Sequence, residues 1–437
     1  MVPKRYIFKK KRLVFLMPEP GDKVEIKTNQ DIFLGTLMPS IKEEVLVIKL
    51  ESGYNLGINK HKIKQVNLLS KKEIKEVKKA KIIPKKGLKK VTILHTGGTI
   101  ASKVSYETGG TISRFTPEEL LELYPTIKEL VNIDSKLISN IFSEDMRFGH
   151  YNLMAKAIAL ELEKGAEGII ITHGTDTLHY TAAALSFILE NLSIPVLLVG
   201  SQRSSDRGSS DARLNLEAAC QFIAQTDFIG VAICMHETTS DSSCVILPGL
   251  KTRKMHSSKR DAFKSINMGP IARIQDSKIH VIAPFKRPSS KKLIVKPIKE
   301  GLKIGILKVH PNLLVEELRA YNKFDGLILE GTGLGHLPIN SFDKITEYNK
   351  KILNELKRLT AKIPVIVTTQ TIYGRINMNV YSTGRILQEV GVMGNLLDMT
   401  SETAFIKLAW VLSNYPKEVR EKFHENLRGE INTRLLE

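Results

Sequence analysis

Two loops and one lysine-rich stretch carry the residue types that nucleophilic attack by a hydroxyl requires. "HTGGTIAS" contains Thr99, and "THGTDT" contains Thr175 followed by Asp176. A hydroxyl is a weak nucleophile near neutral pH, so it needs a base nearby and a path for its proton. Asp176 is too weak a base alone, but a carboxylate can orient a lysine, and a lysine whose pKa is lowered by burial can serve as a base. "LKTRKMHSSKRDAF" offers Lys254 for this role.

Glycines precede both threonines. Gly97 and Gly98 let the backbone bend, and N–H groups near Gly98 or Gly174 are candidates to stabilise a developing oxyanion. A tight strand-to-helix turn is the simpler interpretation of Gly-Gly-Thr alone. The phosphate-binding patterns G-x-G-x-x-G and G-x-x-x-x-G-K-[ST] do not fit this loop, so support for nucleotide binding is weak.

The neighbouring charged groups have ordinary structural interpretations. We expect Lys251 and Lys259 on a solvated basic surface. We expect His173 and His256 at core or loop positions. No spacing of His, Asp or Glu resembles a metal site, so we expect no metal.

Both loops follow apolar runs that are typical of buried strands. From residue 91 to residue 285, "VTIL", "GIIIT", "PVLLVG" and "GVAIC" end in small-residue loops and alternate with helical patterns. This pattern indicates a parallel α/β sheet, in which ligands bind at the carboxyl ends of the strands. We therefore expect Thr99, Thr175 and Arg203 on one edge of one sheet.

A second α/β domain is predicted over residues 301–437. Its strands are "LKIGILKV", "FDGLILEG" and "IPVIVTTQ", and "NSFDKITEYNKKILNELKRLTAK" supplies a helix. A last long helix starts near "MTSETAFIKLAWVLSN", where Ser401, with Glu402 and Thr403, is the expected cap. "RPSSKKLIVKPIKEGLK" is interpreted as a linker.

Five short alternating segments precede residue 70: "DKVEIKT", "IFLGTLM", "EVLVIKL", "YNLGINK" and "IKQVNLL". They predict a small β-barrel or curled sheet over residues 1–70, followed by a basic linker over residues 71–90. The expected fold class is α/β, with this N-terminal domain in front of a two-lobed parallel-sheet unit.

Composition narrows the class of protein. The chain has 437 residues, 42% of them hydrophobic and 25% charged, which are values of a globular protein of more than one domain. We found no apolar run of about 18 residues and no signal-peptide pattern, so we expect a cytoplasmic protein without a membrane span. Cys220, Cys234 and Cys244 are expected to be reduced and buried.

The positive charge is unevenly distributed. The net charge is +19, and residues 1–90 hold 23 Lys or Arg against 9 Asp or Glu, a local excess of +14. Such a concentration suggests a polyanionic partner such as nucleic acid. A soluble, lysine-rich surface explains it equally well.

The motifs "TGGTIAS", "SEDM", "HGTDT" and "RKMHSSKRDAF" occur in the order found in bacterial-type L-asparaginases. This resemblance covers residues 91–410. The barrel-like segment, "KMHSSKRDAF" and "MTSETAFIKLAWVL" make the chain still more similar to one branch, the D subunits of archaeal glutamyl-tRNA(Gln) amidotransferases. That branch resembles an asparaginase with a small β-barrel in front.

The resemblance implies roles for particular residues. Thr99 matches the first nucleophilic threonine of the family, Thr175 and Asp176 match the second threonine and its acid, and Lys254 completes a Thr–Lys–Asp arrangement.

The resemblance also implies substrate contacts. Ser143 and Glu144 match the positions that hold the α-amino and α-carboxylate end of the substrate. Tyr106 is the tyrosine near the first loop, but its spacing differs from that of the family, so this match is loose.

The implied function is that of a glutaminase subunit. One threonine attacks the side-chain amide of glutamine, and the ammonia passes to the E subunit of the amidotransferase, which converts Glu-tRNA(Gln) to Gln-tRNA(Gln). ATP and Mg²⁺ would be used by that partner, and no cofactor is expected in this chain. The resemblance further implies a homodimer of this chain, a heterodimer or heterotetramer with the E subunit, and contact with tRNA(Gln) through the complex.

Two other functions fit part of the sequence. A stand-alone L-asparaginase shares the fold, but the front domain and its charge argue against it. A non-catalytic nucleic-acid-binding scaffold is disfavoured because the four residues of the expected centre are all present. The sequence leaves open which threonine attacks first and what the barrel does. It also does not decide whether glutamine or asparagine is the preferred substrate, since the one methylene by which they differ is worth only about 1–3 kcal/mol in a pocket.

Overall fold

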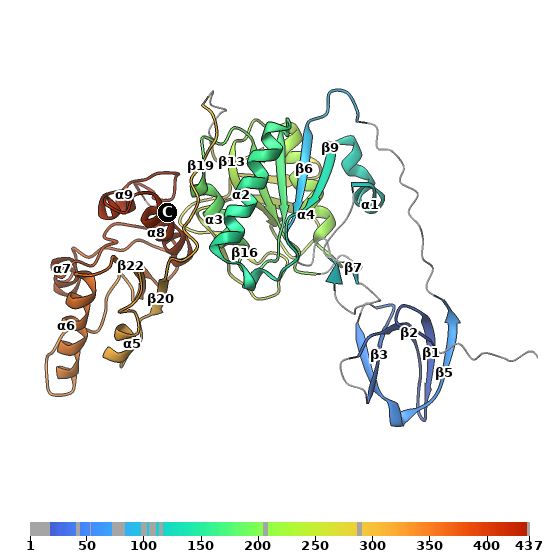
Figure 1. Cartoon of the computed structure of the whole chain (residues 1–437), viewed down its shortest axis with the longest axis horizontal. Helices are drawn as coiled ribbons and strands as arrows, with labels where there is room; N and C mark the ends of the chain where they lie inside the picture. The colour runs from blue at the N-terminus through green and yellow to red at the C-terminus, as the bar shows by residue number, and fades with distance from the viewer. Residues whose placement is uncertain are drawn as a thin grey trace, which may run out of the picture. The chain divides into compact units, whose positions relative to one another are not determined.

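The computed structural model describes residues 18–40, 44–52, 54–71, 84–97, 103–104, 111–112, 117–203, 209–285 and 291–434. The chain divides into two compact units, Met1–Lys79 with Lys103–Ile112, and Ala80–Ser102 with Ser113–Glu437. Figure 1 labels their helices and strands. Gly98, Thr99 and Tyr106 lie outside the described residues, so their predicted roles stay predictions.

The smaller unit contains a five-stranded antiparallel sheet, which confirms the five predicted strands. Its order is β4 (Asn55–Asn59), β3 (Val45–Lys49), β2 (Ile32–Met38), β1 (Lys23–Thr28) and β5 (Ile63–Ser70). The sheet curves around a small apolar core made by Val24, Ile26, Leu37, Ile48 and Ile58 (Figure 1). Among the described strands, β4 and β5 are edges and do not pair, so the curled-sheet form of the prediction fits the ladder better than a closed barrel. The separate short strands β7 (Lys103–Val104) and β8 (Thr111–Ile112) pair with one another.

The larger unit has two lobes, and an eight-stranded sheet forms the first. Its order is β18 (Lys278–Val281), β17 (Ala272–Gln275), β14 (Ser243–Pro248), β13 (Gly230–His236), β12 (Pro195–Val199), β10 (Gly168–Thr172), β6 (Lys90–His95) and β9 (Asn132–Leu137). The five strands from β13 to β9 are parallel, as predicted. Strands β14, β17 and β18 were not predicted from the sequence, and they extend the sheet, each antiparallel to its neighbour. Short connections join β13 to β14 and β17 to β18, as antiparallel pairs allow.

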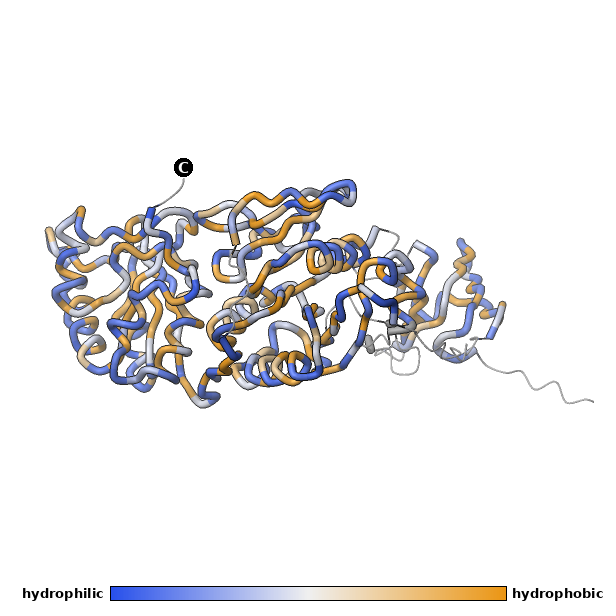
Figure 2. Tube along the Cα trace, turned by 90° about the horizontal axis from the view of Figure 1, so that it is seen from above, coloured by the Kyte–Doolittle hydropathy of each residue, from blue (hydrophilic) through white to orange (hydrophobic). Residues whose placement is uncertain are grey.

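Helices cover both faces of this sheet, which explains why its central strands read as continuous apolar runs. On one face, α2 (Phe148–Glu163) and α3 (Leu178–Ile188) pack on Ile169 and Ile171 of β10. On the other face, α1 (Pro117–Leu123) and α4 (Ala212–Gln225) pack near Ile170. Hydrophobic and hydrophilic segments alternate along the trace accordingly (Figure 2).

The second lobe is a smaller α/β layer structure. Its parallel sheet has the order β20 (Ile304–Lys308), β21 (Gly326–Gly331) and β22 (Val365–Thr369), as predicted. The helices α5 (Val315–Arg319), α6 (Asn349–Thr360) and α7 (Ser382–Glu389) cover one face of this sheet. The helices α8 (Ser401–Asn414) and α9 (Val419–His424) cover the other.

Helix α8 joins the two lobes. It packs on α3 of the first lobe, and the Trp410 ring stacks on Phe187 with the ring centroids 5.6 Å apart. Thr400 is the N-cap of this helix. Its hydroxyl accepts a hydrogen bond from the Thr403 backbone N–H at 3.3 Å. The expected Ser401 cap is therefore wrong by one position, because Ser401 already has helical geometry and Thr400 supplies the extended residue.

The segment that joins the two lobes contains a short strand and contacts helix α8. Within it, β19 (Ile294–Val295) pairs with β11 (Leu189–Glu190), and the Lys296 carbonyl accepts the Trp410 indole N–H at 3.0 Å. Among the residues that the structure describes, no helix combines the length and apolarity needed to cross a bilayer.

Candidate active site

The turn after β10 is braced by a buried histidine. The Nδ1 atom of His173 lies 2.7 Å from the Gly174 carbonyl, and Nε2 lies 2.8 Å from the Thr181 hydroxyl on α3. Burial lowers the pKa of His173 to about 4, so this imidazole is neutral at physiological pH. His173 thus has the core position that was predicted, and it fixes the turn that carries Thr175.

A short hairpin brings Lys254 to this turn. The hairpin pairs β15 (Thr252–Lys254) with β16 (Phe263–Ser265). The Lys254 ammonium donates hydrogen bonds to Oγ1 of Thr175 at 2.9 Å and to Oδ1 of Asp176 at 2.7 Å. The Lys254 side chain is 9% exposed, whereas that of Asp176 is 64% exposed. A hydroxyl, an amine and a carboxylate therefore meet at the edge of the sheet, with the amine between the other two groups.

Ser143 lies against the same turn. It begins a 3₁₀ turn that also contains Glu144, and its side chain is buried while Glu144 is exposed. The Thr177 hydroxyl donates a hydrogen bond to the Ser143 carbonyl at 2.5 Å. A Cβ at Gly174 would lie 2.9 Å from the Ser143 hydroxyl, so only glycine at 174 permits this approach. The structure thus places Ser143 and Gly174 together.

Gly97 lets the first loop bend against a neighbouring segment. Its φ is +117°, and a Cβ there would lie 2.2 Å from the Ile141 carbonyl oxygen. The Ile141 N–H also donates to the Thr96 carbonyl. The glycine therefore allows the end of β6 to contact the segment that leads into Ser143, two residues before it.

The loop after β12 packs on Thr175 from a third side. A Cβ at Gly200 would lie 2.8 Å from the Thr175 methyl group. The carboxylate of Asp211 holds this loop, since it accepts the Ser201 hydroxyl and the backbone N–H groups of Gln202 and Arg203 at 2.9–3.0 Å. Sequence reasoning missed Asp211. An acidic residue directly before a helix in a Ser-rich loop is nevertheless a recognisable signal for a carboxylate that accepts hydrogen bonds from that loop.

A cavity of about 420 Å³ lies beside the Lys254 amine. Its lining residues are Asp176, His179, Tyr180, Arg253, Lys254, Met255, His256, Ser257 and Glu402. Burial, with Arg253 and Lys254 nearby, lowers the pKa of His179 to about 3. Glu402 comes from α8, so the second lobe contributes to the surroundings of Lys254. His179, Arg253 and Glu402 were not singled out from the sequence because nothing in their spacing connects them.

One expectation about this region is wrong. Lys251 is fully buried instead of solvated, because its ammonium lies 2.8 Å from the equally buried Asp398 carboxylate of the second lobe. The others are confirmed: Lys259 is exposed, and His256 lies in an exposed loop, where its Nδ1 accepts the Ser258 and Lys259 backbone N–H groups. The three cysteines are free and buried, as predicted.

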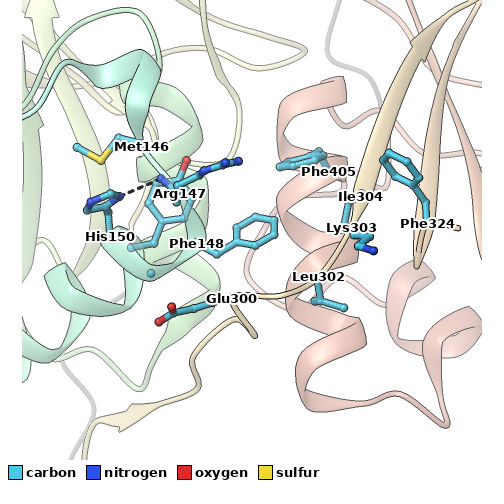
Figure 3. Close-up of a pocket in the computed structure, with 12 residues that line it drawn as sticks. Met146, Arg147, Phe148, His150, Glu300, Leu302, Lys303, Ile304, Phe324 and Phe405 are labelled. Carbon is cyan, nitrogen blue, oxygen red and sulfur yellow. Dashed lines mark hydrogen bonds between the residues drawn. The ribbon is translucent and has the colours of Figure 1, made fainter. Parts of the chain in front are cut away.

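A second cavity, of about 710 Å³, lies between the lobes of the larger unit. Figure 3 shows Phe148 at the start of α2 facing Phe405 of α8, and the two ring centroids are 5.8 Å apart. Arg147, Glu300 and Lys303 line its rim. Asp176 and Lys254 line the smaller cavity and not this one. Among the described residues, no group of three His, Cys, Asp or Glu is placed to hold a metal.

Comparison with protein families agrees with this architecture. The family model "Asparaginase, N-terminal" matches residues 90–287, "Glutaminase/Asparaginase C-terminal domain" matches residues 303–423, and "GatD N-terminal domain" matches residues 18–69. The chain is thus similar to asparaginases over both lobes and to a narrower family over the small sheet.

Solved structures of L-asparaginases are similar to most of this chain. The L-asparaginase of Thermococcus kodakarensis is 32% identical, with a TM-score of 0.69, and the match covers 78% of this chain and 99% of that one. L-asparaginase I of Vibrio cholerae is 30% identical, with a TM-score of 0.68, over 79% of this chain and 99% of that one.

Curated relatives match nearly the whole chain. The glutamyl-tRNA(Gln) amidotransferase D subunit of Methanococcus maripaludis is 44% identical over 94% of this chain and 98% of its own length. The protein of the same name from Pyrococcus furiosus is 44% identical over 94% of this chain and 92% of its own length. The chain therefore belongs to the family of glutamyl-tRNA(Gln) amidotransferase D subunits.

Proposed function

We propose that this chain is the glutaminase subunit of a glutamyl-tRNA(Gln) amidotransferase. It hydrolyses the side-chain amide of glutamine and supplies ammonia to a partner protein. The observation that carries the proposal is the Lys254 amine, which bridges Thr175 and Asp176 in a chain of which 94% matches an amidotransferase D subunit.

The geometry suits proton relay at an acyl-transfer centre. In its neutral form the Lys254 amine can accept the Thr175 proton across 2.9 Å, and Asp176 holds that amine in place at 2.7 Å and stabilises the ammonium that forms. Thr99 is the proposed nucleophile that forms the acyl-enzyme and releases ammonia. The Thr99 hydroxyl proton goes to the departing –NH₂ group, which leaves as ammonia. Thr175, Lys254 and Asp176 relay protons in this step and then position the water that hydrolyses the ester and restores the Thr99 hydroxyl.

The substrate's amino-acid end is proposed to bind at Ser143 and Glu144. Both are presented by one 3₁₀ turn, and Thr177 ties that turn to the loop of Thr175. Backbone N–H groups near Gly98 and Gly174 are the proposed donors to the oxyanion. No step proposed for this chain needs a metal or a nucleotide, and we assign ATP and Mg²⁺ to the partner.

The partner is proposed to be the E subunit of the amidotransferase, in a heterodimer or heterotetramer, with this chain as a homodimer and with tRNA(Gln) bound through the complex. The basic charge favours contact with tRNA by particular segments. Residues 18–70, which include the small sheet, hold seven Lys against seven Asp or Glu, so they are neutral overall. The excess comes from residues 1–17, with six Lys or Arg and no acid, and residues 71–90, with ten Lys and two Glu. We propose a cytoplasmic location.

A stand-alone L-asparaginase is the less favoured alternative. The asparaginase structures leave about a fifth of this chain unmatched, whereas the amidotransferase relatives extend over 94% of it. The match to the GatD N-terminal model falls on residues 18–69.

Ammonia release from glutamine and from asparagine tests the proposal. It should be measured with the purified chain alone, with the E subunit, and with the E subunit plus Glu-tRNA(Gln). Release that rises sharply only in the complete mixture supports a coupled glutaminase. Fast release by the lone chain, higher with asparagine and indifferent to the partner, contradicts it.

A further inference from the structure

The strand that carries Lys254 is held from its other side by the second lobe. Side chains alternate between the two faces of a strand. Lys254 reaches Thr175 and Asp176, whereas Lys251 and Arg253 reach groups at the start of α8 in the second lobe.

Three residue pairs make up this clamp, which we define as the contacts of Leu250, Lys251 and Arg253 with residues 398–403. The Lys251 ammonium lies 2.8 Å from Asp398 Oδ1 and donates to the Asp398 carbonyl at 3.2 Å. The Arg253 guanidinium Nε lies 3.1 Å from Glu402 Oε1. The Thr403 hydroxyl donates to the Leu250 carbonyl at 2.9 Å.

Buried charge pairing and further hydrogen bonds support the clamp. The side chains of Lys251 and Asp398 are both fully buried, so each charge is kept in place by the large cost of leaving the other unpaired. Asp398 is itself fixed, since its carboxylate accepts the Asn432 amide at 2.8 Å and its carbonyl accepts the Asn267 amide at 2.9 Å. The first turn of α8 is capped by Thr400, which fixes Glu402 and Thr403.

The position of Lys254 is sensitive to such support. Its amine must stay within hydrogen-bond distance of two groups on the opposite turn, and a displacement of about 1 Å costs on the order of 100-fold in rate. Within the part of the chain that the structure describes, the first lobe supports Lys254 through the pairing of its strand β15 with β16. Arg253 and Glu402 also line the cavity beside Lys254, so the clamp adjoins the reaction centre.

We propose that Glu402 and Asp398 of the second lobe are positioning residues for Lys254, acting through Arg253 and Lys251. The proposal rests on the proposed function, in which Lys254 takes part in amide hydrolysis. The second lobe then determines the geometry of a centre whose reacting groups all belong to the first lobe.

Helix α8 also provides a matched control. Lys407 pairs with Glu430, both side chains are fully buried, and the Lys407 ammonium also donates to the Glu425 carbonyl at 2.6 Å. Lys407 lies on the same helix as Glu402, and its pair with Glu430 is as fully buried as Lys251–Asp398. Its partners lie in the C-terminal segment and not on the Lys254 strand. Lys407→Met therefore reports the loss of stability without the loss of the clamp.

The test measures kcat and KM for ammonia release from glutamine and asparagine, together with melting temperature, in the reconstituted complex. Arg253→Met and Glu402→Ala should each lower kcat at least about tenfold with KM within about twofold of wild type. Because both act through one contact, the double variant should be no slower than the slower single variant. Glu402→Gln, which keeps an oxygen for the Arg253 N–H, should recover most of the kcat. Lys407→Met should lower the melting temperature and leave kcat unchanged.

The inference is overturned if Arg253→Met and Glu402→Ala keep wild-type kcat, if their losses multiply in the double variant, or if Lys407→Met lowers kcat as much. The partly exposed Arg253–Glu402 pair is tested first because its variants are the ones expected to fold. If the wild-type complex releases no ammonia from either amide, the proposed function itself fails and the inference fails with it. If the wild-type complex releases ammonia and the Arg253 and Glu402 variants keep the wild-type kcat, only the inference fails and the proposed function stands.

Discussion

The Nζ atom of Lys254 lies 2.9 Å from Oγ1 of Thr175, although 79 positions separate the two residues in the chain. The contact joins the loop after a central parallel strand to a hairpin beyond the fourth helix. The contact forms only when both the sheet and the β15–β16 hairpin are folded, so it depends on the whole first lobe.

Lys254→Met should abolish most glutaminase turnover while the protein stays folded. Methionine has a similar length but offers no amine to relay the Thr175 proton, and loss of general base catalysis typically costs about 10²–10⁴-fold. Initial rates of ammonia release report the effect. Lys259→Met is the matched control, because Lys259 is an exposed lysine five residues away. Near-normal turnover in Lys254→Met would remove Lys254 from the mechanism.

Thr177→Val should act mainly on substrate binding. The Thr177 hydroxyl holds the Ser143 carbonyl, and one hydrogen bond of this kind is worth about 0.5–1.5 kcal/mol, so KM for glutamine should rise about two- to tenfold. Thr226→Val is the control, since the Thr226 hydroxyl makes a comparable bond to the Phe222 carbonyl at the end of α4. An unchanged KM in Thr177→Val, or an equal rise in Thr226→Val, would show that the turn at Ser143 does not depend on this bond.

Gly97→Ala should be far more damaging than Gly165→Ala. Both glycines have positive φ, +117° and +81°, but a Cβ at 97 would lie 2.2 Å from the Ile141 oxygen, whereas nothing lies within 4 Å at 165. Gly165→Ala should therefore cost only the backbone strain of about 1–2 kcal/mol. Gly97→Ala adds a clash that must displace β6 or the Ser143 segment. Urea unfolding of both variants measures the difference, and equal losses would contradict the role assigned to Gly97.

His173 should make the stability of the larger unit depend on pH. Its folded pKa of about 4 lies below the unfolded value of about 6.5, so the unfolded chain binds more protons between these values. Its contribution therefore lowers stability as the pH falls from about 6.5 towards 4. His236 and His310, whose pKa values are raised by neighbouring hydrogen-bond partners although burial of His236 opposes this, act in the opposite direction.

His173→Gln isolates this contribution. At pH 7 the variant should melt at a lower temperature than wild type, because two buried hydrogen bonds are disturbed. At pH 5 the gap in melting temperature should shrink, since only the wild type then has to keep a buried histidine neutral. A gap that stays constant or widens at pH 5 would contradict a neutral buried His173.

Local pattern was enough to predict the strands that lead to the site and the identity of Thr175, Asp176 and Lys254. The apolar runs before "THGTDT" and "SQRSSD" became β10 and β12, as their composition indicates. The burial of Lys251 was not predictable in this way, because its partner Asp398 lies 147 positions away in the other lobe. The antiparallel strands β14, β17 and β18 were not predicted, and β17 and β18 are only four residues long and partly exposed, so they carry little apolar signal. The positions of Glu402 and Asp211 likewise depend on tertiary contacts.

The most direct test of the proposed function follows the amide nitrogen of glutamine. The complex with the E subunit is given [amide-¹⁵N]glutamine, ATP, Mg²⁺ and Glu-tRNA(Gln), and the label in Gln-tRNA(Gln) is measured for wild type and Lys254→Met, with and without added ammonium chloride. We expect labelled product with wild type, almost none with Lys254→Met, and recovery of unlabelled product in the variant when ammonium is added. Labelled product at the wild-type rate in Lys254→Met, or no transfer of label by the wild-type complex, would contradict the proposed function.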